Sequence, residues 1–287
     1  MSQSDKDLFA EAKKLYLEQS ESSYKEAYRI IKGNAKLAKV VSEDGESLLH
    51  FACKYNLIDH VKLLLSQGSD VNIAGGRLKN SPLHETCFNP NKVNRDMKSR
   101  SSHTTSLLIV KLLIKNQADV NAVNKYSTTP LHSCCIEGLA DCAAYLIDHG
   151  ADITLKAGKA AKESTALHFA AEYGWASITK LLLARGADRN VTNGENKVPY
   201  QVAIESTVIF DENMRKAVCD MFETDLTDLS QVDVNIPTPE IQGNKNTTAG
   251  SEAETGTSIA RGNGNNTHGR EEEGKNATSA AGCCVCS

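Results

Sequence analysis

Apolar residues recur along most of the chain in paired blocks, and their spacing predicts a series of short helices. The second block of each pair is a nearly continuous apolar run, found at Val61–Leu65, Val110–Ile114, Ala144–Ile147 and Thr179–Leu183. A landmark sequence follows each run, at Gly68–Asn72, Ala118–Asn121, Gly150–Ile153 and Gly186–Asn190. The runs are therefore expected to be helices, and glycine is expected to end three of the four in a left-handed conformation.

A short phrase ending in histidine precedes each run and predicts the first helix of the pair. Four copies are present, Ser47–His50, Ser81–His84, Thr129–His132 and Thr165–His168, and a worn fifth copy is Val198–Gln201. Serine or threonine is a favourable helix N-cap, and the proline of Ser81-Pro82 or Thr129-Pro130 loses no hydrogen bond in a first turn. A helix pair and a loop thus repeat about every 33 residues.

Three aligned landmarks in four copies resemble the ankyrin repeat over about residues 42–223. The resemblance implies an all-α fold, an ankyrin-repeat solenoid of helix-turn-helix units joined by hairpin loops. The expected units are 42–74, 75–122, 123–155, 156–191 and a capping unit at 192–223. It also implies structural duties: the four histidines bond backbone near the next hairpin, and Asn72, Asn121 and Asn190 fix the hairpins.

The second unit is longer than the others, because residues 90–104 are inserted between its two helices. This polar, basic segment is either a functional loop or a tolerated surface insertion, since lengthening a loop costs little free energy. Smaller insertions fall in the hairpins before units two and four. The latter hairpin carries Lys156, Lys159 and Lys162.

The two ends of the chain differ from the repeats. Residues 1–41 have helical spacing of apolar residues without the repeat's phrases, which predicts a helical N-terminal cap or degenerate repeat. Residues 224–287 are rich in Gly, Asn, Ser, Thr and Glu and carry a net charge of about −5, so they cannot bury enough surface to fold. We expect a disordered acidic tether there.

The composition indicates the cellular compartment of the protein and argues against several classes of function. The chain has nine cysteines, an odd number, and its start shows neither a basic nor an apolar segment of a secretory signal, which favours free thiols in a reducing compartment. The net charge of −4 argues against a general nucleic-acid binder. No cofactor or metal motif is apparent, and Cys134 and Cys135 stand where ankyrin repeats usually carry two core alanines. We therefore expect no enzyme; an unrecognised Cys nucleophile is the alternative.

Protein binding is the function that the repeats imply. Carried over by position, the partner-binding residues on the concave face and hairpins are Lys54, Tyr55, Lys79, Phe88, Tyr126, Glu137, Glu172 and Tyr173. Aromatic side chains favour interfaces because they bury much area with few torsions. The alternative is that some of them pack against neighbouring units.

The ending Cys284-Val285-Cys286-Ser287 looks like a CaaX signal, with serine of the type associated with farnesylation of Cys284 by a prenyltransferase. Cys286 departs from the pattern, which prefers an aliphatic residue there. One lipid gives only marginal membrane binding, and Cys283 is the expected second, palmitoylated site. Soft-metal binding by the clustered thiols is the rival interpretation.

The pattern as a whole predicts a non-enzymatic scaffold held at the cytosolic face of a membrane. Two origins fit this layout. A eukaryotic cell could make the protein as its own prenylated scaffold. Alternatively, the chain resembles ankyrin-repeat effectors of intracellular bacteria that use the host prenylation machinery, and the polar C-terminal stretches of such effectors often contain a glutamate cluster like Glu271–Glu273. The alternative function is a soluble cytoplasmic adaptor or inhibitor with an incidental cysteine-rich tail.

Overall fold

The computed structural model describes residues 2–88, 100–209 and 211–223, with side chains omitted for residues 100–103. The predicted tether, the residues Cys283 and Cys284 and most of the 90–104 insertion lie outside these residues. The described part is helical and contains isolated bridges at hairpin bases but no strands. This confirms the all-α fold class.

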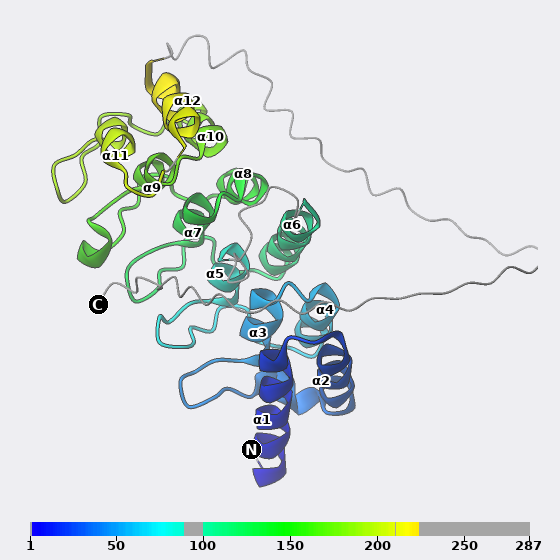
Figure 1. The fold of residues 1–287 in the computed structure, drawn as a ribbon. Coiled ribbons are helices and arrows are strands. Elements are labelled where there is room, and N and C mark those ends of the chain that lie inside the picture. The colour runs from blue at the N-terminus through cyan, green and yellow to red at the C-terminus, as the bar shows by residue number, and fades with distance from the viewer. Residues whose placement is uncertain (1, 89–99, 210, 224–287) are drawn as a thin grey trace, which may run out of the picture. The chain divides into compact units, whose positions relative to one another are not determined.

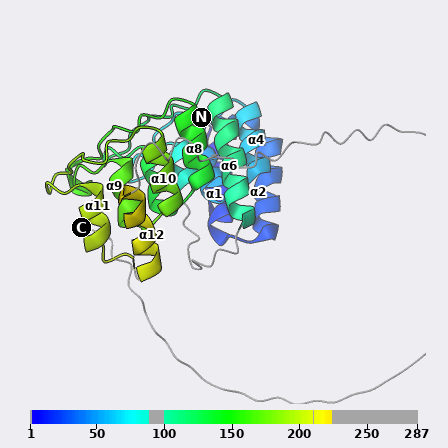
Figure 2. The same ribbon diagram turned by 90° about the horizontal axis from the view of Figure 1, so that it is seen from above.

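Two layers of helices run through the stack (Figure 1). The first layer holds α1 (Gln3–Glu18), α3 (Leu48–Lys54), α5 (Pro82–Cys87), α7 (Pro130–Glu137), α9 (Ala166–Glu172) and α11 (Pro199–Glu205). The second holds α2 (Glu21–Gly33), α4 (Ile58–Ser66), α6 (Arg100–Lys115), α8 (Ala140–Asp148), α10 (Ala176–Ala184) and α12 (Glu212–Glu223). Within each layer every helix packs on the next, and both layers are visible from above in Figure 2.

The core lies between the layers and between successive units. Buried leucines repeat at the third position of the histidine phrase, as Leu49, Leu83, Leu131 and Leu167, each at most 1% exposed. Small side chains such as Ala52, Cys134 and Ala170 fill the adjoining positions and let the helices approach closely. The sequence's shortage of aromatic residues thus suits a stack of thin, closely spaced units.

Each phrase histidine joins its own helix pair to the hairpin that follows it. In His132, Nδ1 accepts the backbone N–H of Thr129 at 3.0 Å, and Nε2 lies 3.1 Å from the carbonyl oxygen of Leu155. A carbonyl can only accept, so Nε2 carries the proton and the ring is the neutral Nε2–H tautomer. His50, His84 and His168 form the same bridge to the carbonyls of Asn80, Thr128 and Lys197, respectively. The structural duty expected of these histidines is confirmed; we call these contacts histidine bridges.

The N-terminal helices extend the two layers. α1 packs on α3, α2 packs on α4, and a 3-10 helix, η1 (Ala35–Lys39), contacts all four of these helices. Tyr16 is fully buried against Phe51, with ring centroids 6.1 Å apart. Residues 2–39 thus cover the apolar face of the first histidine-bearing unit.

The insertion departs in part from the expected loop. α6 is 16 residues long whereas α4, α8 and α10 have nine each, so residues 100–104 belong to a helix. The extra turns are anchored by Ser106, which is 1% exposed and donates to Oδ1 of Asn56 at 3.1 Å. Residues 89–99 lie outside the described residues.

Candidate binding surface

Five hairpins connect the units and project from one side of the stack; their tips are bonded to one another. These hairpins span residues 41–47, 73–80, 122–128, 155–165 and 191–198. Main-chain N–H groups donate from each tip to a carbonyl of its neighbour, from Gly76 to Asp44 (3.1 Å), Lys125 to Leu78 (2.8 Å), Gly158 to Tyr126 (2.7 Å) and Gly194 to Lys162 (2.7 Å). The tips therefore form one continuous edge.

Glycine permits one of these contacts through its size. A Cβ on Gly158 would lie 2.8 Å from the carbonyl oxygen of Tyr126, a distance that real Cβ atoms essentially never show. The third and fourth hairpins can thus approach closely only because residue 158 has no side chain.

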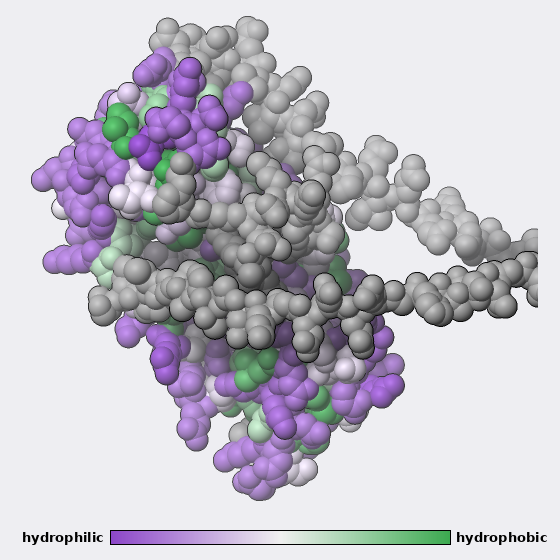
Figure 3. Space-filling model, in the orientation of Figure 1, coloured by the Kyte–Doolittle hydropathy of each residue, from purple (hydrophilic) through white to green (hydrophobic). Residues whose placement is uncertain are grey.

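Exposed cations gather on three successive hairpins. They are Arg77 and Lys79 on the second, Lys125 on the third, and Lys156, Lys159 and Lys162 on the fourth. We call this set the cationic ridge. Acidic residues bound it, with Glu43 and Asp44 on the first hairpin and Glu195 on the fifth. Hydrophilic residues dominate the left edge of the molecule in Figure 3, where loops project.

Most of the ridge's charge is not neutralised within the protein. Lys162 pairs with Glu195 at 3.1 Å, whereas Lys79 and Lys156 donate only to main-chain carbonyls. Arg77, Lys125 and Lys159 form no ion pair with any other residue that the structure describes. Neighbouring like charges on a surface raise the local potential and attract an anionic partner.

Apolar side chains lie beside these cations on the second and third hairpins. Leu78 is 40% exposed, Tyr126 40% and Val123 59%. The bond from the Lys125 amide to the Leu78 carbonyl fixes these two hairpins side by side. The surface therefore offers apolar contact next to positive charge.

The eight predicted partner residues divide among three environments. Lys79 and Tyr126 lie on the hairpin tips, and Phe88, at the C-cap of α5, is exposed. Half-buried residues form the second group: Lys54, Tyr55, Glu172 and Tyr173. Glu137 differs from the expected exposure, because it is only 7% exposed at the end of α7. The structure thus does not gather the eight into one equally accessible surface.

Contacts of the half-buried residues explain why the eight do not share one accessible surface. The ring of Tyr55 packs against Tyr24 of α2, with centroids 6.2 Å apart, and Lys54 reaches over the Tyr55 ring at 6.0 Å. Burial also raises the pKa of Glu172. Packing against neighbouring elements, the alternative left open by the sequence, accounts for Tyr55.

Sequence reasoning missed Arg77, Val123 and Lys125 as surface residues. Arg77 and Lys125 stand at equal spacing before His84 and His132, so comparison of the repeats at that position would have found them. Their equal spacing could be read from the sequence, but these positions lie outside the phrases that define the repeat.

The cysteines of the described units are core residues. Cys53, Cys87, Cys134, Cys135 and Cys142 are buried and free. Burial raises the pKa of Cys53 to about 12 and also raises the pKa of Cys134. A buried, protonated thiol is a poor nucleophile.

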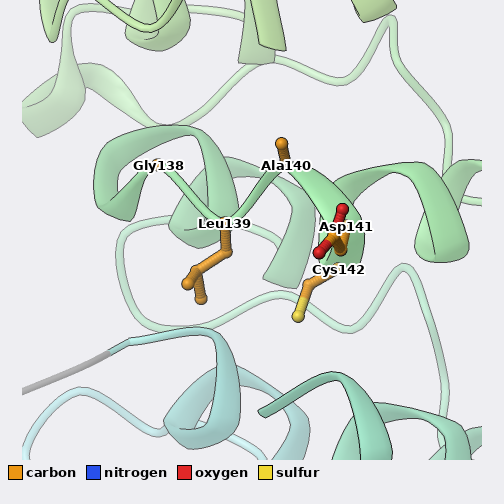
Figure 4. Close-up of a pocket in the computed structure, with 5 residues that line it drawn as sticks. All are labelled: Gly138, Leu139, Ala140, Asp141 and Cys142. Atoms are coloured by element: carbon orange, nitrogen blue, oxygen red, sulfur yellow. The ribbon is translucent and has the colours of Figure 1, made fainter. Parts of the chain in front are cut away.

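One pocket lies at the turn between α7 and α8 (Figure 4). Residues 138–142 line it, and its volume of about 90 Å³ is small beside the ~300–1,000 Å³ of drug-sized ligand sites. Among the described residues, no group of His, Cys, Asp or Glu side chains could hold a metal ion, and no helix is long and apolar enough to cross a membrane.

Comparison with known proteins agrees with the geometry. Family models described as ankyrin repeats match residues 44–75, 99–157 and 159–203. The chain is 35% identical over 119 residues to "Transient receptor potential cation channel subfamily A member 1 homolog" of Caenorhabditis elegans, covering 40% of this chain and 10% of that protein. It is 30% identical over 177 residues to "Ankyrin repeat and SOCS box protein 16" of Homo sapiens, covering 59% and 35%. "Alpha-latrotoxin-Lg1a" of Latrodectus geometricus is 27% identical over 184 residues, covering 56% and 13%. The chain thus spans 10–35% of the length of these relatives.

Proposed function

Because the chain is built from ankyrin repeats, we propose that it is a non-enzymatic scaffold whose protein partner docks an acidic segment on the cationic ridge. The carrying observation is the row of exposed, largely unpaired cations across three bonded hairpins, with Leu78, Val123 and Tyr126 beside them. Charge complementarity steers association and fixes register, while apolar contacts contribute most of the affinity.

An extended protein segment fits this surface better than nucleic acid does. A phosphate backbone would gain from the cations but not from the three exposed apolar side chains. The acidic residues Glu43 and Asp44, which lie at one end of the ridge, would also repel a long polyanion. A short acidic stretch with apolar side chains satisfies both features.

Reversing two ridge charges is expected to weaken partner binding at least about tenfold, equivalent to about 1.4 kcal/mol. The variant is Lys125→Glu/Lys159→Glu, and binding of captured partners is measured by titration at two salt concentrations. Both side chains are exposed, so folding should be unaffected.

The matched control is Lys62→Glu/Lys216→Glu, which makes the same change in net charge at exposed sites on α4 and α12. It should retain the partners and their affinity. If the ridge variant also keeps every partner at unchanged affinity, the ridge is not the docking surface.

Membrane anchoring is a further part of the proposed function, and it rests on the motif Cys284-Val285-Cys286-Ser287. It requires that Ser287 carry the free carboxylate, because prenyltransferases read a cysteine four positions from a chain end. A farnesyl group on Cys284 and palmitate on Cys283 would together hold the scaffold at a cytosolic membrane face, in the cell that makes it or in a host cell that receives it as an effector.

Substituting Cys284→Ser is expected to move the protein from the membrane fraction to the soluble fraction and to remove a farnesyl mass from its C-terminal peptide. Cys219→Ser, a half-buried cysteine outside the motif, is the control and should leave both unchanged. Equal membrane association of wild type and Cys284→Ser would favour the soluble adaptor.

A further inference from the structure

Three exposed cations of the ridge stand in a row, one on each of three successive hairpins. Each lies at, or directly after, the residue whose main-chain N–H bonds its tip to the preceding hairpin. These donor residues are Gly76, Lys125 and Gly158, and the cations are Arg77, Lys125 and Lys159. Neighbouring cations of the row are therefore separated by one hairpin.

The hydrogen bonds of the hairpins set the spacing of this row. Within a hairpin the two limbs are bonded to each other, as from the Asn124 N–H to the Thr128 carbonyl oxygen at 3.1 Å. Between hairpins the tips are bonded, as from the Lys125 N–H to the Leu78 carbonyl oxygen at 2.8 Å. Hydrogen-bonded extended chains lie about 4.8 Å apart, so a hairpin with two limbs advances the row by about 10 Å. The helices that carry these hairpins, α5, α7 and α9, pack on one another in order, and the usual separation of packed helices, about 8–10 Å, agrees.

A partner segment that meets all three cations needs acidic side chains about 10 Å apart on one face. In a polyproline II helix every third side chain lies on the same face, roughly 9.3 Å further along the axis. A β-strand repeats a face at about 6.6 or 13 Å, which misses this spacing.

An α-helix comes back to one face after seven residues, at about 10.5 Å, but the contact is costlier. It must order about 15 residues to meet three cations, whereas a polyproline II segment orders about seven, and each ordered residue costs conformational entropy. The spacing of the row therefore favours polyproline II.

Apolar side chains form a second row beside the cations. Leu78 follows Arg77 in the chain and Tyr126 follows Lys125, and both apolar side chains are 40% exposed. Because each apolar residue is directly next to its cation, the two rows share one spacing. The other faces of a polyproline II segment repeat with that spacing as well. An apolar residue between successive acids can therefore contact the second row.

We propose that the ridge binds a polyproline II segment with an acidic residue at every third position and an apolar residue between successive acids. The first, fourth and seventh side chains of the segment pair with Arg77, Lys125 and Lys159. Lys125 is the middle cation, so it meets the middle acid in either direction of the bound chain. A proline at the remaining position favours this conformation before binding and lowers the entropy cost of docking. This inference rests on the proposed function, because it specifies the partner segment for the same surface.

Fluorescent nonapeptides titrated against the full chain test the spacing. One peptide is three Glu-Leu-Pro triplets; its match, Glu-Leu-Glu-Leu-Glu-Pro-Leu-Pro-Pro, has the same composition with an acid at every second position. The triplet peptide is expected to bind at least about fivefold more tightly, because its match cannot place three acids on the three cations at once. Equal affinities, or no measurable binding of either peptide, would overturn the proposal.

A charge exchange tests the pairing of Lys125 with the middle acid. Lys125→Glu should weaken binding of the triplet peptide, and a triplet peptide with lysine in place of its middle glutamate should recover the affinity. A peptide with lysine in place of its first glutamate should not. The control Lys62→Glu, at an exposed site on α4, should bind the triplet peptide as wild type does. Equal recovery by the two lysine peptides would mean that charge is recognised without register, which contradicts the proposal.

The two proposals for this surface fail separately. If both nonapeptides bind equally while Lys125→Glu/Lys159→Glu still releases captured partners, the ridge docks an acidic segment in another conformation, and only the polyproline II register is wrong. If that variant keeps its partners and its affinity for both peptides, the ridge is not the docking surface and both proposals fall.

Discussion

Replacing Gly138 by alanine is expected to lower the free energy of unfolding by about 2–5 kcal/mol. Gly138 ends α7 in the left-handed conformation, with φ of 78°, which costs an L-residue roughly 1–2 kcal/mol. A Cβ there would also lie 2.7 Å from the indole ring of Trp175. Moving that ring strains its packing and its N–H bond to the carbonyl of Ile136, at 3.1 Å, for roughly 1–3 kcal/mol more.

Gly150→Ala separates the two causes. Gly150 also has a positive φ, of 93°, but an added Cβ would meet no atom within 4 Å. We expect a loss of only about 1–2 kcal/mol, that of the backbone conformation alone. Denaturant unfolding followed by circular dichroism gives both values, and fluorescence of Trp175, the chain's only tryptophan, reports the displaced ring. Equal losses in the two variants would show that Trp175 moves aside without cost.

Stability is expected to fall steeply as the pH drops below about 6.5. Burial lowers the pKa of His132 to about 4 and also lowers the pKa of His50, His84 and His168. In the unfolded chain these groups titrate near 6.5, so between the two values the unfolded state binds more protons than the folded state does. Stability therefore rises with pH through this window and is lost on acidification. Each histidine contributes at most about 1.4 kcal/mol per pH unit.

The variant His132→Gln tests one bridge. The worn fifth phrase already uses this residue: Oε1 of Gln201 accepts the N–H of Val198 at 3.1 Å, as the histidine nitrogen does elsewhere. Glutamine at position 132 should retain that bond, lose the bridge to Leu155 and reduce the pH slope by about one proton. Denaturation midpoints between pH 5 and 7.5 supply the slopes, and a flat wild-type profile would contradict the mechanism.

Local chemistry made the repeated part of the fold predictable. Thr129 caps a helix, Pro130 suits its first turn and Leu131 is buried, while His132 forms hydrogen bonds with the backbone. The role of each residue in the phrase can therefore be recognised without knowing the rest of the structure. Four copies then place the helices in order. The long α6 was not predicted, because residues 100–106 are polar and the contact of Ser106 with Asn56 joins residues 50 positions apart in sequence.

The binding surface was predictable only in part for the same reason. Tyr126 and Lys79 could be placed from their hairpin positions, but the ridge arises because hydrogen bonds between tips hold the second, third and fourth hairpins side by side. The burial of Glu137 likewise depends on how a neighbouring unit packs over the end of α7. Such properties belong to the stack and not to any one repeat.

The histidine bridges also give the stack a direction. Every bridge runs from a histidine to a carbonyl of the chain that follows it, from His50 to Asn80 and finally from His168 to Lys197. A ribosome delivers the units in that same order, so the newest unit of a growing chain always holds a ring N–H whose acceptor has yet to be synthesised. A chain cut after residue 191 would likewise end in a buried donor without its acceptor.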